Sequence, residues 1–444
     1  MTHHRSRTLI VFLTGVIFSI SSCNKISSPD NTAITNVTIT SLRPTHGPFD
    51  TIDTLTGKGF DQIPVFDSVL LNGQKLTVIS RSNEQVIVKI PSLAGTGNID
   101  IWYQGKEILG PVFTYDSILM VTTVAGVGPE PGEVNGKGID ARFWGPAGLA
   151  LDQTGNIYVC ELSGSSIRKI DTGGNVTTLA GPAAQEPGYV NGTGSEARFS
   201  SPRGICMGPD GNLYVADQNN YRVRKVTLAG VVSNFAGAQW DAIPNDGAFD
   251  GPPDIATFDS PFGVASDNIG NIYVADCYNN KIRKITPAGF VSSLAGTDYY
   301  NSGWQDGQGT SARFYGPVGI ASDSAGNVFV IDDETHTLRK ITPDGNVITL
   351  LGPKEPSITG LYDLFSAGAL ATDQYGNLFF SISVGIIKMT PDGTIIRYAC
   401  GGIGETDGPA ATVATYRAIT GIAVAQNGTL YITDNNRVRK IAWQ

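Results

Sequence analysis

The side chains that most often carry catalysis or hold metals are few in this chain. After the first 23 residues the sequence has two histidines, His46 and His336, and its cysteines follow no CxxC spacing. A zinc site needs several closely placed histidine or cysteine ligands, so a zinc centre is not expected. No Ser–His–Asp arrangement and no phosphate-binding glycine loop is visible. The sequence therefore predicts no enzyme and no cofactor, although a calcium or carboxylate-only site stays open.

Aromatic side chains beside Asn, Asp and Arg are the other chemically useful set. Aromatic faces stack on the apolar faces of sugars, while amide, carboxylate and guanidinium groups bond to the hydroxyls. The alternative is that these segments bury their aromatic residues as small local cores. We expect at least part of the set to form an exposed ligand-binding patch. Its candidate residues are Trp144, Arg203, Tyr221, Trp240, Phe262, Tyr278, Tyr299, Tyr300, Trp304, Tyr315 and His336.

These candidates lie between or within copies of one repeated pattern. Residues 260–296 predict four short strands, separated by Gly, Pro, Asn and Asp turn signals. A lone four-stranded meander leaves an apolar face exposed, so it needs copies of itself on either side. Close copies occupy 145–181, 201–237 and 316–352, and degenerate copies occupy 366–401 and 418–444. Six copies predict the six blades of a β-propeller over residues 117–444.

The sixth copy lacks its fourth strand, and a matching strand stands before the first copy. Residues 121–126 (VTTVAG) closely match residues 176–181 (VTTLAG), which form the fourth strand of the first copy. An N-terminal strand that completes the last sheet closes the ring and removes an open edge. The sequence therefore predicts a closed propeller in an all-β chain.

The repeated pattern PxGIAxDxxGNxYVADxxNxxIRKI resembles the NHL repeat, and the resemblance covers about residues 120–444. It implies a propeller fold. It does not decide function, because similar propellers serve as binding platforms, scaffolds and lyases. We expect the ligand face at the end where the inter-blade connections meet the loops between second and third strands, since loops on a rigid scaffold are free to vary.

Residue types that recur at one position of the repeat are expected to stabilise the blade rather than to bind a ligand. Ala-Arg-Phe triplets precede several blades and predict a phenylalanine wedged between blades, with an arginine capping backbone carbonyls rather than binding a ligand. These phenylalanines are Phe143, Phe199 and Phe314, with Phe258 at the same place. Aspartates that close the second strands are expected to accept hydrogen bonds from backbone amides. They are Asp217, Asp276, Asp332 and Asp434.

Two further recurring patterns receive structural interpretations. Asn-Gly and Asp-Gly pairs predict turns, with calcium sites as the alternative. The pairs begin at Asn135, Asn191, Asp246, Asp306 and Asp407. Arg-Lys pairs on the third strands predict a solvated, salt-bridged basic belt rather than a phosphate track. They begin at Arg168, Arg224, Arg283, Arg339 and Arg439. The cysteines of the repeats are expected to be small buried side chains, with a Cys160–Cys206 disulfide as an open alternative.

Residues 1–23 predict a targeting segment. Arg5 and Arg7 precede an apolar run, and Ile20-Ser-Ser-Cys23 resembles the lipobox of bacterial lipoproteins. The resemblance implies a signal peptide that ends at a lipidated Cys23, with a plain secretory signal as the alternative. Residues 24–36 are polar and predict a flexible tether. We expect lipid anchoring in the outer membrane at the cell surface, with the periplasmic face as the alternative.

Residues 37–116 predict a separate small β domain. Leu42-Arg-Pro-Thr-His-Gly-Pro48 and Thr54-Leu-Thr-Gly-Lys-Gly-Phe60 resemble the opening of an IPT/TIG domain, which has an immunoglobulin-like sandwich fold. Phe60 and Phe113 are expected in its core. We interpret this domain as a spacer between the membrane and the propeller.

Length and charge limit the remaining possibilities. The chain has 444 residues, 41% of them hydrophobic, and a formal net charge of −9, which disfavours generic nucleic-acid binding. The predicted layout resembles surface glycan-binding lipoproteins of Gram-negative polysaccharide-uptake systems. It therefore favours an oligosaccharide or polysaccharide as ligand, with an outer-membrane transport or envelope protein as a further partner. The alternatives are a protein–protein scaffold of an envelope complex and a propeller lyase or hydrolase.

Overall fold

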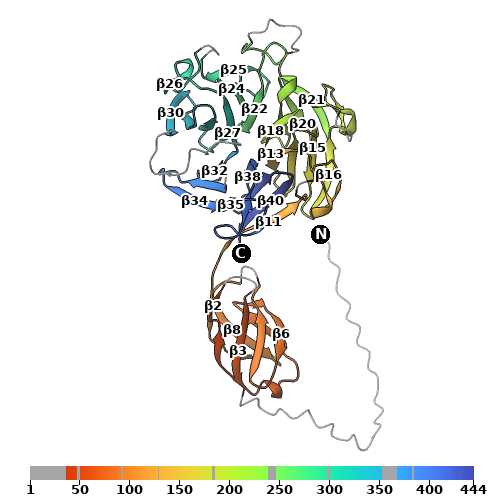
Figure 1. The fold of residues 1–444 in the computed structure, drawn as a ribbon, viewed down its shortest axis with the longest axis vertical. Helices are drawn as coiled ribbons and strands as arrows, with labels where there is room; N and C mark the ends of the chain where they lie inside the picture. Colours follow the sequence, from red (N-terminus) through yellow and green to blue (C-terminus); the bar gives the residue numbers. More distant parts are fainter. Residues whose placement is uncertain are drawn as a thin grey trace, which may run out of the picture. The chain divides into compact units, whose positions relative to one another are not determined.

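A computed structural model describes residues 37–47, 51–91, 94–128, 130–182, 186–238, 247–297, 301–352, 368–382 and 385–444. The described residues fall into two compact units, one within residues 37–114 and one that runs from Tyr115 to Gln444 (Figure 1). Among them, no helix has the length and apolar character needed to span a membrane. The predicted signal segment, lipidated Cys23 and tether lie outside the described residues.

The N-terminal unit is a sandwich of two antiparallel sheets. The first sheet has the order β1 (Thr38–Arg43), β3 (Ile52–Lys58), β7 (Gln85–Lys89) and β6 (Thr77–Arg81). The second has the order β2 (His46–Gly47), β10 (Val112–Tyr115), β8 (Gly97–Tyr103), β4 (Ser68–Leu71) and β5 (Gln74–Lys75), with β9 (Lys106–Ile108) also paired to β8. Phe60 and Phe113 are fully buried, which confirms their predicted place in the core.

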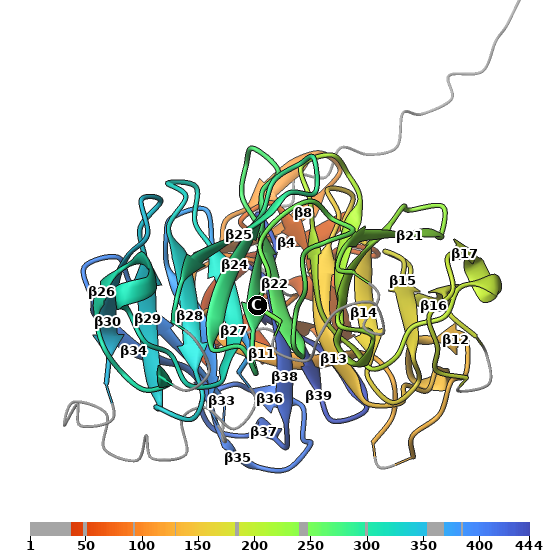
Figure 2. The same ribbon diagram turned by 90° about the horizontal axis from the view of Figure 1, so that it is seen from above.

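The C-terminal unit contains six blades, each a sheet of four main strands in its described part (Figures 1 and 2). From the innermost strand outward, blade 1 is β13 (Pro146–Leu151), β14 (Ile157–Glu161), β15 (Ser166–Ile170) and β16 (Asn175–Ala180). Blade 2 is β18 (Pro202–Met207), β19 (Leu213–Asp217), β20 (Arg222–Val226) and β21 (Val231–Ala236). Blade 3 is β22 (Pro261–Ser266), β23 (Ile272–Asp276), β24 (Lys281–Ile285) and β25 (Val291–Ala295).

The remaining blades follow the same order. Blade 4 is β27 (Pro317–Ser322), β28 (Val328–Asp332), β29 (Thr337–Ile341) and β30 (Asn346–Leu351). Blade 5 is β31 (Leu370–Thr372), β32 (Leu378–Ile382), β33 (Gly385–Met389) and β34 (Ile395–Cys400). Blade 6 is β38 (Ile419–Val424), β39 (Leu430–Asp434), β40 (Arg437–Trp443) and β11 (Leu119–Ala125). Short outer strands β12 (Gly136–Lys137), β17 (Gly192–Thr193), β26 (Gly307–Gln308) and β36 (Gly408–Pro409) extend four blades.

The ring closes as the sequence predicted. Strand β11, from the start of this unit, pairs antiparallel with β40, from the end of the chain, in a register that runs from Leu119 opposite Trp443 to Ala125 opposite Val438. The fourth strand of blade 6 therefore comes from the N-terminal side of the propeller, and the pairing leaves no open seam between the first and last blades.

The third-strand arginines are buried, so the predicted solvated belt is wrong for them. All five have no exposed surface, and their guanidinium groups pair with the acid that ends the second strand of the same blade. The pairs are Arg168–Glu161 (3.0 Å), Arg224–Asp217 (2.8 Å), Arg283–Asp276 (2.8 Å), Arg339–Asp332 (3.9 Å) and Arg439–Asp434 (2.6 Å). Neighbouring blades cover both faces of each sheet, and therefore these strands have no face turned to water.

The Asn-Gly and Asp-Gly pairs also have a different role from the predicted turns. Their first residues accept a second hydrogen bond from the buried arginines, and the glycines begin the short outer strands. The acceptors are Asn135 (2.9 Å), Asn191 (2.7 Å), Asp250 (2.7 Å), Asp306 (2.8 Å) and Asp407 (3.1 Å). In blade 3 the position belongs to Asp250, whereas the predicted Asp246 lies outside the described residues.

The predicted roles of the wedge and of the second-strand acids are confirmed. The wedge phenylalanines Phe143, Phe199, Phe258 and Phe314 are fully buried. Arg198 of the same triplets donates to the carbonyl oxygens of Ser195 and Ala197. The backbone N–H groups of Ser200 and Asp259 donate to Asp217 and Asp276, each at 2.7 Å. These contacts fix the start of blades 2 and 3 to the end of their second strands.

Candidate functional site

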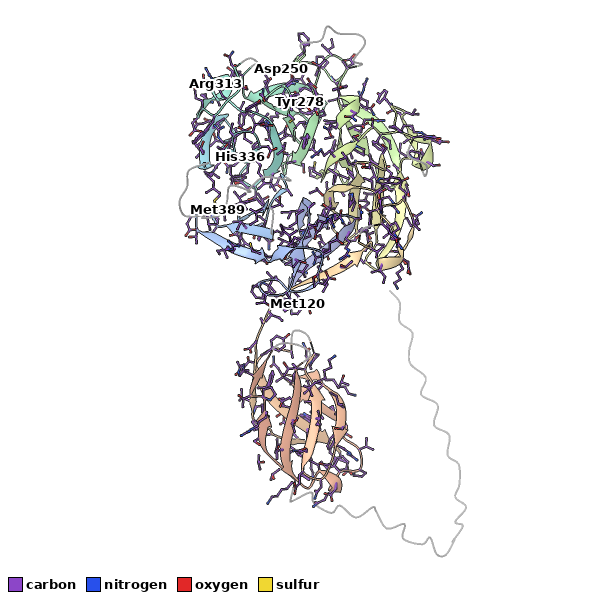
Figure 3. The ribbon with its side chains drawn as sticks, viewed as in Figure 1. Met120, Asp250, Tyr278, Arg313, His336 and Met389 are labelled. Atoms are coloured by element: carbon purple, nitrogen blue, oxygen red, sulfur yellow. The ribbon has the colours of Figure 1, made fainter. Side chains whose placement is uncertain are left out.

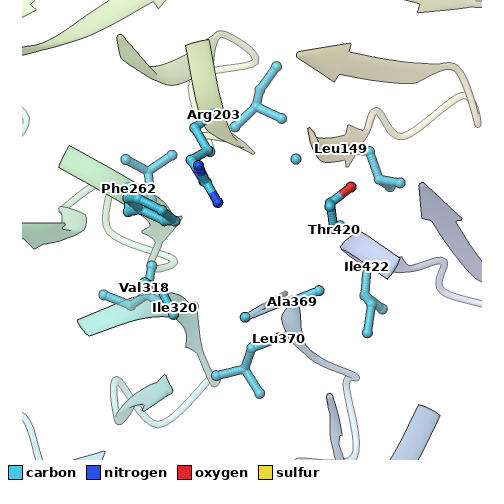
Figure 4. A pocket seen from close by; sticks show the side chains of 17 residues that line it. Leu149, Arg203, Phe262, Val318, Ile320, Ala369, Leu370, Thr420 and Ile422 are labelled. Carbon is cyan, nitrogen blue, oxygen red and sulfur yellow. The ribbon is translucent and has the colours of Figure 1, made fainter. Parts of the chain in front are cut away.

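The innermost strands of all six blades surround an axial cavity, which we call the cup (Figure 4). The cup has a volume of about 80 Å³ and is lined by residues of β13, β18, β22, β27, β31 and β38, together with Gly368 and Ala369. Glycine stands at one position in five of these strands, because a Cβ atom there would collide with a carbonyl oxygen of the next blade. These glycines are Gly148, Gly204, Gly263, Gly319 and Gly421.

The residues that follow these positions form an apolar layer that lines the cup. One aliphatic side chain from each blade contributes to this layer, and all six are buried. They are Leu149, Ile205, Val264, Ile320, Leu370 and Ile422. This layer supplies no hydrogen-bonding group, and any polar recognition must come from the opposite end of the cup.

The residues before the glycine positions give the cup an uneven wall. Val318 and Gly368 are aliphatic or small, and the hydroxyl of Thr420 already donates to the carbonyl oxygen of Pro146 at 2.8 Å. On the other side the guanidinium carbon of Arg203 lies over the ring of Phe262, 3.5 Å from the ring centroid (Figure 4). The positive charge of Arg203 therefore lies on one side of the cup.

Arg203 has no ion pair and donates no hydrogen bond within the part of the chain that the structure describes. Its guanidinium points into the cup beside Phe262 (Figure 4). Burial lowers the pKa of Arg203 to about 10, and neighbouring acidic groups, Asp333 among them, oppose the shift. The side chain stays cationic at neutral pH.

Two loops of neighbouring blades bring further groups near Arg203. The loop after β23 supplies Cys277 and the exposed Tyr278, and the loop after β28 supplies Asp333 and His336 (Figure 3). Burial raises the pKa of Asp333, as does the Glu334 carboxylate, while His336 and Arg203 lower it. Asp333 is therefore a partly desolvated acceptor close to the half-buried guanidinium of Arg203.

Backbone hydrogen bonds hold these loops against the inter-blade connections. Gly164 donates to the carbonyl of Trp144 at 3.2 Å, Tyr278 to that of Asp259 at 3.2 Å, and Glu334 to that of Tyr315 at 3.2 Å. The second-to-third-strand loops and the connections therefore meet at one end of the propeller, which we call the loop face. Trp144, Tyr278 and Tyr315 are exposed there, Tyr278 to 60%.

The structure brings together part of the predicted ligand set. Arg203 and Phe262 line the cup, and Trp144, Tyr278, Tyr315 and His336 belong to the loop face around it. Tyr221 lies in the equivalent loop of blade 2, is half-buried, and adopts a left-handed conformation with φ of 55°. Trp240, Tyr299 and Tyr300 lie outside the described residues.

Trp304 does not belong to this group. Its indole N–H donates to the hydroxyl of Thr349 on β30, the fourth strand of blade 4, at 2.8 Å. It therefore lies along the outer part of the blade rather than beside the cup. Asp333 is the residue that sequence reasoning missed, although it directly follows the recurring second-strand acid of blade 4.

The described residues contain no group of three or more His, Cys, Asp or Glu side chains placed to hold a metal ion. Cys160, Cys206, Cys277 and Cys400 are free thiols, so the structure does not have a Cys160–Cys206 disulfide. Burial raises the pKa of Cys206 and of Cys277 to about 12 in each case, which keeps both protonated at neutral pH.

Comparison with known proteins identifies the two kinds of unit. The IPT/TIG domain model matches residues 37–115, and the NHL repeat model matches residues 199–226. The N-terminal unit is therefore an IPT/TIG domain, and the propeller contains an NHL repeat, as the sequence predicted.

Curated relatives match part of this chain. Protein SUPPRESSOR OF QUENCHING 1 of Arabidopsis thaliana is 28% identical over 56% of this chain, and NHL repeat-containing protein 2 of Bos taurus is 36% identical over 22%. Teneurin-3 of Mus musculus is 25% identical over 54% of the chain. The matched regions span 25%, 14% and 10% of the lengths of these three relatives.

Similar solved structures include a binding protein and an enzyme. An auxiliary nutrient binding protein from Bacteroides ovatus is 17% identical, with a TM-score of 0.44, over 92% of this chain and 98% of its own. A gluconolactonase from Xanthomonas campestris is 12% identical, with a TM-score of 0.48, over 73% of this chain and 89% of its own.

Proposed function

We propose that this chain is a non-enzymatic binding protein that recognises an oligosaccharide or polysaccharide on the loop face of its propeller. The observation that carries the proposal is the cup, in which Arg203 stacks on Phe262, together with the exposed Trp144, Tyr278 and Tyr315 of the loop face. Exposed rings beside carboxylate and guanidinium groups suit the alternating apolar and hydroxylated surfaces of sugars.

The size of the cup favours a ligand that lies mainly across the loop face. Pockets that enclose a drug-sized ligand have volumes of about 300–1,000 Å³. The cup, at about 80 Å³, admits only a substituent of a larger molecule. A polysaccharide fits this arrangement, since one sugar unit can insert a group while its neighbours contact the surrounding aromatic rings.

The proposal extends to the cellular setting. We propose that Cys23 carries the lipid anchor, that the protein is attached to the outer membrane, and that the IPT/TIG domain separates the propeller from the membrane. An exposed site on a rigid propeller is then available to polymers outside the membrane or in the periplasm.

The test is affinity electrophoresis of the soluble chain, starting after Cys23, in gels that contain plant, host or microbial polysaccharides. Retardation by one class of glycan, unchanged by a chelator and lost in Tyr278→Ala, supports glycan binding on the loop face. Analysis of the glycan after incubation tests the enzyme alternative, because a lyase or hydrolase would shorten it. Absence of retardation by every glycan would overturn the proposal.

The second candidate function is a protein–protein scaffold. It is supported by an exposed edge strand and a groove in the IPT/TIG domain. Strand β6 is an edge strand whose five residues, Thr77–Arg81, are all exposed, Ile79 to 50%. A groove of about 440 Å³ lined by Phe66, Leu76 and Val78 lies beside it. Edge strands with free backbone groups can pair with an extended partner segment. Capture of an envelope protein by the wild type but not by Val78→Lys would favour this candidate.

A further inference from the structure

We infer that the group bound in the cup is the carboxylate of an acidic sugar unit, an inference that rests on the proposed function. A polysaccharide with uronate units is therefore the expected ligand class. The inference depends on the contrast between Arg203, which is half-buried and has no ion pair in the described part of the chain, and the five paired arginines that are fully buried in the same propeller.

Five third-strand arginines are fully buried, and each has an acidic partner within 4 Å in its own blade. Arg203 is half-buried, and it has no such partner among the described residues. A desolvated cation without a counter-ion is costly, which is why buried charges are normally paired. The propeller supplies carboxylates to its structural arginines and leaves this one free for an anion from outside.

The orientation of Arg203 suits a carboxylate. Stacking on Phe262 covers one face of the planar guanidinium and leaves its N–H edge available. Two N–H groups of that edge can donate in parallel to the two oxygens of a carboxylate, a geometry that adds strength and selectivity. The aliphatic floor of Leu149, Ile205 and Val264 offers no competing donor or acceptor side chain.

The neighbouring acid limits the charge of the ligand. Asp333 is close enough to Arg203 to influence its pKa, so a dianionic phosphate would meet repulsion from Asp333. A single carboxylate is tolerated better, and Asp333 can accept a hydrogen bond from a hydroxyl of the same sugar. Tyr278, which adjoins this cluster and is 60% exposed, offers a ring face to the next sugar unit.

The experiment compares a polyuronate with the same polymer after its carboxylates have been reduced to alcohols. Binding is measured by affinity electrophoresis and titration calorimetry with the wild type, Arg203→Gln and Arg203→Lys. Arg313→Gln is the matched control, since Arg313 is an exposed arginine whose loss changes the net charge equally (Figure 3). Thermal unfolding checks that each variant remains folded, and a sulfated polymer and a peptide with a free C-terminus are additional probes.

We expect the polyuronate to bind, the reduced polymer to bind at least about tenfold more weakly, and Arg203→Gln to lose the same factor while Arg313→Gln does not. Arg203→Lys should recover part of the affinity, because it keeps the charge but not the fork geometry. Equal binding of both polymers, or binding of neutral or sulfated glycans that is indifferent to Arg203→Gln, would overturn the carboxylate inference and leave glycan binding intact. Binding of the peptide without any glycan would overturn both.

Discussion

Arg203 and Phe262 stand at the same position of neighbouring blades, and the guanidinium of one lies 3.5 Å from the ring centroid of the other. Both precede the glycine that lets adjacent inner strands approach, so each is held at the cup by a close backbone contact. The equivalent residues in other blades are Ala147, Val318 and Thr420. A position that the scaffold leaves free thus carries the polar and aromatic groups of the candidate site.

The stacked pair gives the first prediction. Phe262→Leu keeps an apolar side chain in the wall of the cup but removes the ring that orients Arg203. A cation–π contact contributes about 0.5–2 kcal/mol, so we expect affinity for the acidic polysaccharide to fall about two- to thirtyfold. Calorimetry measures the change, and Phe290→Leu, at an exposed ring beside β25, is the control. Unchanged affinity in Phe262→Leu would mean that the stack does not orient the guanidinium for binding.

The second prediction concerns the buried Arg283–Asp276 pair. Arg283→Met leaves a fully buried Asp276 carboxylate without its counter-ion, and we expect a loss of about 3–5 kcal/mol in the free energy of unfolding. In blade 5 an apolar pair replaces the ion pair, because Ile382 and Ile387 occupy the equivalent positions and are buried. Asp276→Ile combined with Arg283→Ile should therefore be more stable than Arg283→Met in urea unfolding. A double variant that is no more stable than the single one would contradict this account of the pair.

How far the sequence predicts the molecule depends on what each residue contacts. The blades, the wedge phenylalanines and the closing strand repeat in the sequence, so they could be predicted. Burial of Arg283 could not be read from strand alternation, because both faces of a blade are covered by neighbouring blades. Its partner Asp250 has a local signal, since it precedes Phe258 by the same spacing that separates Asn135 from Phe143.

The positions of residues in the inter-blade connections were harder to predict from the sequence than those of residues that recur in every repeat. Trp304 and Tyr315 belong to the same inter-blade connection, yet Trp304 bonds to Thr349 on an outer strand while Tyr315 lies on the loop face. Their separation depends on the path of that connection, which no repeat in the sequence specifies. The loop-face geometry needed the three-dimensional structure.

Closure of the ring gives the third prediction. Val121 of β11 is fully buried and lies opposite Ile441 of β40. Val121→Asp places an unpaired charge in the joint between the first and last strands, and we expect a loss of at least about 3 kcal/mol and a lower midpoint of thermal unfolding. Thr122→Asp, at the neighbouring half-buried position, is the control and should have a much smaller effect. Equal effects of the two substitutions would argue against closure through β11.

The fourth prediction concerns pH and the IPT/TIG domain. Burial raises the pKa of Asp53 on β3 to about 6, against backbone hydrogen bonds at Thr54 and Arg43 that lower it. The folded state therefore binds the proton more tightly than the unfolded state, and the resulting stability is present at low pH and lost between about pH 4 and pH 6. Asp53→Asn should protect the β3 amides from hydrogen exchange more strongly at pH 7, by about tenfold, and by less at pH 4. Equal protection at both pH values would show that Asp53 does not titrate in this range.

The central claim, that glycan binds on the loop face, is tested most directly by one paired titration. Fragments of a polysaccharide that retards the protein are titrated by calorimetry into the wild type, Tyr278→Ala and Trp304→Ala. Both variants remove one exposed aromatic side chain, but only Tyr278 lies beside the cup. The account predicts about a fivefold weaker affinity in Tyr278→Ala and an unchanged affinity in Trp304→Ala, since stacking on one sugar ring contributes on the order of 1 kcal/mol. Lost binding in Trp304→Ala with full binding in Tyr278→Ala would contradict it and move the site to the outer side of blade 4.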